Sequence, residues 1–160
     1  MLFSDADWGN DPITRKSTTG MVSMLHGGPI SWGSKKQRSV STSSTEAEYI
    51  ALATSAKQSQ WIAQILRDID HAELLGSNPF CVEIKEDNQG AIALAKNPHL
   101  HERSKHIDIC YHVTRDLETR KRIQLTFVPS DQMVADGFTK PLSGVHFARF
   151  LKQLGMRRNQ

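Results

Sequence analysis

The segment from Thr45 to Arg67 constrains the fold most, because it indicates one long helix between two groups of strands. Its apolar residues fall on two strips at helical spacing, as expected for a helix that is covered on more than one side. Many of these residues are alanines, which allow close approach to a sheet. The residues at its start carry hydroxyl groups that can cap a helix N-terminus: Ser43, Ser44 and Thr45.

Strands are predicted on both sides of this helix. Before it, we expect an antiparallel meander made of a strand at 1–7, two strands within 20–34 joined by a Gly-Gly-Pro turn, and a strand-like piece at 37–44. After it, strands are expected at 80–87 and 122–130. The remaining elements are helices or helical turns, expected at 88–98, 101–121, 131–142 and 144–156. This order predicts an α/β fold with a sheet that is antiparallel first and parallel after the crossover helix.

The bulk composition is that of an ordinary globular chain. Its 160 residues fit a single domain, for which we expect a core at about 2–142 and a C-terminal helix at about 143–156. No apolar run approaches the length of a membrane span, and the start lacks the layout of a secretory signal, so we expect a cytoplasmic, non-secreted protein without membrane contact. The net charge of +3 is concentrated in short basic clusters, which suits a polyanionic partner.

Carboxylates follow the expected strands at two separate places. Asp5 ends the first strand and Asp87 ends the fourth, and ligands of α/β sheets gather at the carboxyl ends of strands. Glu48 near the start of the long helix and Asp136 after the last strand can reach the same edge. Because such carboxylates would repel one another, we expect divalent cations between them, and oxygen ligands suit Mg²⁺ or Mn²⁺.

The motifs that carry these acids resemble those of a known family. The stretches SDADWG, STSSTEAEYIAL, EDNQGAIALAKNPHLHERSKHIDICYH and VADGFTKPL resemble the ribonuclease H domain of the Pol polyprotein of copia-type LTR retrotransposons, from about residue 2 to 142. The resemblance implies a ribonuclease H-like α/β fold, with a five-stranded mixed sheet flanked by helices. It also implies endonucleolytic cleavage of the RNA strand of RNA:DNA hybrids during reverse transcription.

The resemblance assigns the metal site to four acids. Two Mg²⁺ ions, with Mn²⁺ as a substitute, are expected on the catalytic set Asp5, Glu48, Asp87 and Asp136. Two nearby acids compete with these choices. Asp5 is preferred to Asp7 because it stands where the apolar strand ends, and Glu48 is preferred to Glu46 because EYIAL matches the pattern of ribonuclease H helices.

Nucleic-acid contacts are expected around this site. Selection of the hybrid should come from its shape and its 2′-hydroxyl groups, with basic side chains on the phosphates. The candidates are Ser44, Asn88, Gln89, Lys35, Lys36, Arg103 and Lys105, and a solvated surface role explains each equally well. The expected partners are the hybrid and the reverse transcriptase domain of the same polyprotein, within cytoplasmic virus-like particles. The sequence indicates no oligomeric state.

A catalytic histidine is harder to place. Many ribonucleases H carry one in the loop before the last catalytic helix, where this chain has VPSDQMVAD. His101 and His106 are the candidates for a proton shuttle, although a histidine on a helix more often lies at the surface or at a cap. A zinc site in the same histidine-rich stretch lacks the usual paired spacing.

Two other functions use the same fold. Integrases and transposases place their glutamate last, on a late helix, whereas here it comes second and on the first helix. A catalytically inactive connector or nucleic-acid-binding module of the polyprotein is the remaining alternative, and the presence of all four acids argues against it.

Overall fold

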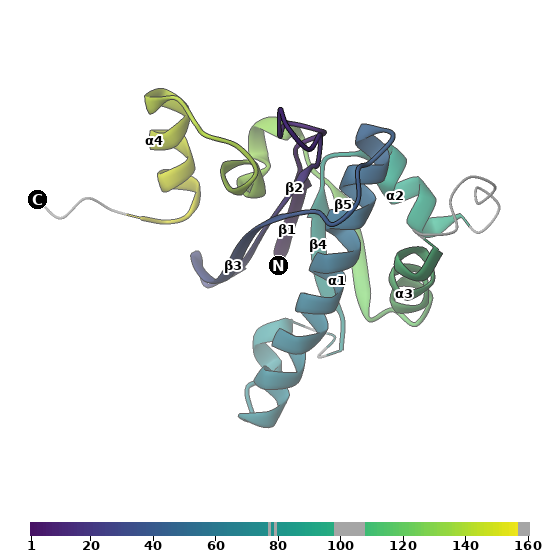
Figure 1. Cartoon of the computed structure of the whole chain (residues 1–160). Coiled ribbons are helices and arrows are strands. Elements are labelled where there is room, and N and C mark those ends of the chain that lie inside the picture. The colour runs from purple at the N-terminus through teal and green to yellow at the C-terminus, as the bar shows by residue number, and fades with distance from the viewer. Residues whose placement is uncertain (77, 79, 98–107, 157–160) are drawn as a thin grey trace, which may run out of the picture.

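The structure is a computed structural model that describes residues 1–76, 78, 80–97 and 108–156. Its centre is a five-stranded sheet with the order β3-β2-β1-β4-β5 (Figure 1). The strands are β1 Leu2–Ala6, β2 Thr18–Leu25, β3 Gly28–Lys36, β4 Val82–Glu86 and β5 Ile123–Phe127. The first three strands are antiparallel, and β4 and β5 run parallel to β1. This confirms the predicted mixed sheet.

Helices cover both faces of the sheet. The α-helices are α1 Ser44–Asp68, α2 Gln89–Lys96, α3 Asp108–Thr119 and α4 Gly144–Gln153, and the 3₁₀ turns are η1 Ala72–Leu75, η2 Ser130–Gln132 and η3 Val134–Phe138. The first three α-helices lie on one side of the sheet, and η3 and α4 lie on the other (Figure 1). Within the described residues, no helix is both long and apolar enough to cross a membrane.

Alternating side chains of the strands supply two separate cores. Leu2, Ile84 and Leu125 point toward α1, where they contact Tyr49 and Leu52. On the opposite face, a second group packs beneath η3 and α4, with these members: Phe3, Val22, Val128, Met133, Val134, Ala135, Phe150 and Leu154. A strand in the middle of this sheet is therefore buried on both faces, as β1 is along its whole length.

The start of α1 is fixed by its capping residue. Ser43 is the N-cap, and its hydroxyl accepts a hydrogen bond of 3.1 Å from the backbone N–H of Glu46. The second apolar strip of this helix, Ile62, Ile65 and Leu66, is covered only in part, because Leu66 is buried and Ile62 is half-buried whereas Ile65 is 37% exposed. The prediction of a helix covered on more than one side therefore holds for its first half and not for its end.

The strand predicted at 37–44 is wrong. After β3 the chain leaves the sheet, because the buried side chain of Gln37 donates to the carbonyl oxygen of Ala47 at 2.9 Å and accepts from the hydroxyl of Ser41 at 3.0 Å. These bonds turn the segment toward α1. The hairpin turn also lies earlier than predicted, since His26 and Gly27 have positive φ and Gly28 already belongs to β3.

A glycine in β2 allows η3 to lie close against the sheet. Gly20 pairs with Asp5 across β1 and β2. A Cβ atom at Gly20 would lie 2.6 Å from the carbonyl oxygen of Ala135 and 2.6 Å from Cγ2 of Thr139. The missing side chain therefore lets the segment that carries Asp136 come down onto the end of β1.

We expect Gly20→Ala to lower the free energy of unfolding by roughly 1–3 kcal/mol, because the new methyl group must push η3 away from β2. Chemical denaturation measures the change. Gly144→Ala is the matched control, since a Cβ atom there meets nothing within 4 Å and its φ is not positive. Equal stability of the two variants would show that η3 does not depend on close contact with Gly20.

Candidate metal centre

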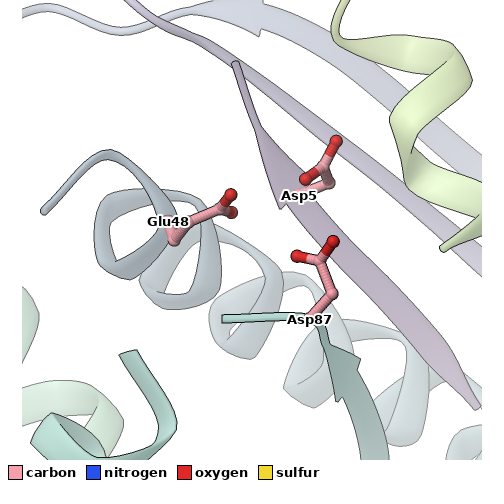
Figure 2. Close-up of side chains that lie close together, drawn as sticks. All are labelled: Asp5, Glu48 and Asp87. Carbon is pink, nitrogen blue, oxygen red and sulfur yellow. The ribbon is translucent and has the colours of Figure 1, made fainter. Parts of the chain in front are cut away.

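Three carboxylates meet at the end of the central strands. Asp5 lies on β1, Glu48 on the first turns of α1, and Asp87 directly after β4. Each offers an oxygen atom, and these atoms lie within 4.8 Å of one another. Figure 2 shows the three side chains turned toward a common point. The structure therefore brings together three of the four acids that the sequence indicated.

Burial sets the electrostatics of this group. Asp5 is 6% exposed and Glu48 is 7% exposed, so water screens little of their charge. Burial, then the charges of Asp87 and Asp136, raise the pKa of Asp5 from 3.8 to about 7, although Thr139 donates a hydrogen bond of 3.2 Å to it. Without a cation, the carboxyl group of Asp5 therefore holds its proton to a higher pH than a free aspartate does.

Glu48 is affected more strongly than Asp5. Burial is the main cause that raises the pKa of Glu48 from 4.5 to about 11, followed by the charges of Glu86 and Asp5. Among the described residues, no hydrogen-bond donor reaches its buried atom Oε2. A buried carboxylate oxygen without a donor is costly, and a bound cation would supply the missing partner.

Asp136 lies beside this group on η3. Its Oδ1 forms an ion pair of 2.5 Å with Nζ of Lys140, four residues further along the chain. The charge of Asp136 acts on Asp5, because it is one of the causes that raise the pKa of Asp5. The fourth acid is thus at the same edge of the sheet, but it is paired with a lysine rather than gathered with the other three.

The two competing acids have other roles in the structure. The carboxylate of Asp7 accepts a short hydrogen bond from the backbone N–H of Thr18 and so closes the loop between β1 and β2. Glu46 accepts from the backbone N–H of Thr42 at 2.8 Å and from its hydroxyl at 2.5 Å. This resembles a capping box at the start of α1. The geometry therefore favours Asp5 and Glu48 as the site residues.

One buried acid was missed by the sequence analysis. Glu86 has no exposed surface, and burial followed by the charge of Asp87 raises its pKa well above 4.5. It lies on the α1 side of the sheet, because the alternation of side chains along β4 places it on the same face as Val82 and Ile84. That alternation was the available signal, because it places Glu86 inside and Asp87 at the rim.

The residues predicted to contact nucleic acid lie in different surroundings. Ser44 and Gln89 are exposed near the start of α1 and α2, and Lys35 is exposed at the end of β3. Asn88 caps α2 by accepting from the N–H of Ala91 at 2.9 Å, and Lys36 is paired with Asp11. The remaining candidates lie outside the described residues: Arg103, Lys105, His101 and His106.

The side chains at this site fit a hard divalent cation. All the ligand atoms are carboxylate oxygens, and no sulfur or imidazole takes part in the group of Asp5, Glu48 and Asp87. Among the described residues, Oε2 of Glu48 is buried without a hydrogen-bond donor. Oxygen-only sites of this kind suit Mg²⁺ or Mn²⁺ rather than zinc.

Comparison with known proteins supports this description of the fold. No family model matches the chain. It is 38% identical over 156 residues to the retrovirus-related Pol polyprotein from transposon RE1 of Arabidopsis thaliana, and 39% identical over 154 residues to that from transposon RE2. The corresponding polyprotein from transposon TNT 1-94 of Nicotiana tabacum is 35% identical over 157 residues. These matches cover 96–98% of this chain, but the chain spans only 10–11% of the polyproteins.

Solved structures with a similar fold are ribonucleases H. The structure of LC11-RNase H1 in complex with an RNA/DNA hybrid superposes with a TM-score of 0.60 at 13% identity, over 86% of this chain and 91% of that one. RNase H1 from Halobacterium salinarum gives a TM-score of 0.55 at 17% identity, over 86% and 92% of the two chains. The chain thus has the ribonuclease H fold, and its homologues are the retrovirus-related Pol polyproteins of copia-type transposons, of which it matches one segment.

Proposed function

We propose that this chain is a ribonuclease H domain that hydrolyses the RNA strand of RNA:DNA hybrids endonucleolytically during reverse transcription. The observation that carries the proposal is the group of Asp5, Glu48 and Asp87, which is largely buried and has a donorless oxygen, on a ribonuclease H fold. A structural role does not explain such a group, because buried carboxylates that repel one another lower stability.

The acids act by holding cations rather than by attacking the substrate. Asp5, Glu48 and Asp87 provide the ligand atoms, and Asp136 provides a fourth carboxylate at the side of the group. Two divalent ions held by these residues would supply an activated water and would stabilise the leaving 3′ oxygen. The surrounding side chains fix these carboxylates, since Thr139 holds Asp5 and the backbone of β4 places Asp87.

The surface around the site provides contacts for a nucleic acid. Ser44 and Gln89 are exposed at the starts of α1 and α2, on elements that also position Glu48 and Asp87. Polar groups placed there suit the 2′-hydroxyl groups in the wide minor groove of a hybrid. Lys35 and Lys36, at the end of β3, would contact phosphates and make the affinity dependent on salt.

Because the chain matches one segment of much longer Pol polyproteins, we extend the proposal to a partner domain and a setting. The reverse transcriptase domain of the same polyprotein is the partner that would bring the hybrid to this site. Cytoplasmic virus-like particles are the proposed setting, in which the chain needs no contact with a membrane.

We expect the protein to cleave the RNA strand of an end-labelled hybrid in Mg²⁺ or Mn²⁺, and not in EDTA. Asp87→Asn removes one ligand charge and should lower the rate by about 100-fold or more. Asp116→Asn is the matched control, because this exposed acid on α3 forms an ion pair with Arg120, four residues away, and is not part of the carboxylate group. Double-stranded DNA and RNA test the selectivity for the hybrid.

Three results of this assay would contradict the proposal. Equal cleavage by Asp87→Asn would move the reaction away from this site, and cleavage of all duplexes would remove the hybrid selectivity. A folded wild-type chain that binds the hybrid without cutting it would favour the connector function.

The metal-free protein should lose stability as the pH rises from about 4 to about 7. Asp5 binds its proton more tightly in the folded state than in the unfolded chain, with a pKa of about 7 against 3.8, so folding is favoured at low pH and this advantage is lost through that range. We expect the melting temperature in EDTA to fall by roughly 5 °C between pH 4 and pH 8.

Asp5→Asn is the control for this pH effect, because it removes the titrating group while keeping its shape. The variant should show a flatter pH profile and a smaller gain in melting temperature when Mg²⁺ is added at pH 8. Identical profiles for the two proteins would mean that Asp5 is not the source of the pH dependence.

A further inference from the structure

A polar cavity adjoins the candidate metal centre. It has a volume of about 310 Å³ and lies between the η2–η3 segment and α4. Met133 and Phe150 line its apolar side. The polar residues that line it are two acids and five other side chains: Asp131, Asp136, Ser130, Lys140, His146, Arg149 and Gln153. Asp136 therefore belongs to this cavity as well as to the edge of the carboxylate group.

The basic side chains of this cavity are held by neighbouring groups and remain open to solvent. Arg149 donates to the carbonyl oxygen of Asp131 at 2.6 Å and to its carboxylate at 3.2 Å, and Gln153 donates to the same carbonyl at 3.1 Å. The side chain of Lys140 is 49% exposed and that of Arg149 is 52% exposed. A ligand can therefore reach both cations without a rearrangement of the backbone.

His146 adds a further nitrogen to this group. Its Nδ1 lies 2.9 Å from the hydroxyl of Ser143, at the N-cap of α4. Within the described part of the chain, its other ring nitrogen has no hydrogen-bond partner. This histidine comes after the last catalytic acid in the sequence, so the sequence analysis, which looked for a histidine before that acid, did not consider it.

We propose that this cavity is a subsite for a backbone phosphate of the bound nucleic acid, with Lys140 and His146 as its hydrogen-bond donors. The proposal rests on the proposed nuclease function, since a strand that lies across Asp136 must pass the rim of the cavity. Lysine and imidazole nitrogens beside a held guanidinium suit a group with a single negative charge and several acceptor oxygens.

The ion pair between Lys140 and Asp136 gives this subsite a distinctive property. Nζ of Lys140 lies 2.5 Å from Oδ1 of Asp136. Removal of the carboxylate charge frees the lysine for the phosphate, whereas removal of the lysine leaves a negative charge beside the strand. The two substitutions should therefore change the affinity for a hybrid in opposite directions, although each breaks the same ion pair.

The test measures binding of a fluorescent RNA:DNA hybrid in EDTA, at several salt concentrations, by anisotropy. We expect Lys140→Gln and His146→Gln to weaken binding by about three- to tenfold, and Lys140→Gln to lower the slope of log affinity against log salt by about one. Asp136→Asn should strengthen binding, and Lys140→Gln in that background should abolish the gain. Lys152→Gln is the matched control, because this lysine is on α4, the helix that carries His146, but does not line the cavity.

Several outcomes would overturn the subsite. These are variants at Lys140 and His146 that bind like Lys152→Gln, a loss of affinity in Asp136→Asn, or a wild-type chain with no measurable binding at low salt. Melting curves of each variant separate a loss of binding from a loss of folding. Cleavage by the wild-type protein in Mg²⁺ is scored separately, so a chain that binds through this cavity but does not cut would retain the subsite and refute the nuclease.

Discussion

The carboxyl groups buried at the end of β1 are the constraint on which the rest of this structure depends. Asp5 and Glu48 are nearly inaccessible to water, Glu86 is completely so, and the charges of all three affect one another. Burying carboxylates lowers stability, and such a group persists only where the surrounding packing fixes the backbone firmly. Here β1 is buried on both faces, and its partners β2 and β4 hold it in register.

The elements around these carboxyl groups provide close packing and hydrogen bonds to them. The 3₁₀ turn η3 crosses β2 at Gly20, where no side chain keeps it away, and brings the Thr139 hydroxyl to Asp5. The same turn carries Asp136 and, four residues later, the lysine that pairs with it. One short segment thus supplies a hydrogen bond, a further carboxylate and a positive charge at the rim of the group.

The sequence predicted much of the fold because its signals are local. Alternating apolar residues in β1, β4 and β5 and the helical spacing in α1 depend on neighbouring positions, and the order of elements then determined the mixed sheet. The segment from Gln37 to Ser43 was misassigned because its strand-like residues follow a buried glutamine, whose bonds to Ala47 and Ser41 are not visible in any local pattern.

The part of the candidate site that depends on local signals was also predictable from the sequence. Asp5 and Asp87 could be found because each ends a strand, and Glu48 because of its position on α1. The pairing of Asp136 with Lys140 and the cavity lined by His146 depend on how η3 lies against α4, and no short-range pattern encodes that contact. Glu86 was missed for a different reason, since an acid beside another acid at a strand end suggests a solvated turn.

The position of β1 in the sheet also bears on how the chain folds. β1, β2 and β3 are consecutive in sequence and pair as an antiparallel meander, whereas the parallel pairing of β1 with β4 must close a loop that includes the whole of α1. Contacts between distant parts of a chain form late, because loop closure costs entropy before it is compensated. Asp87 joins Asp5 and Glu48 only when β4 docks on β1, so a nascent chain completes its local hairpins before it must confine the mutual repulsion of all three carboxylates.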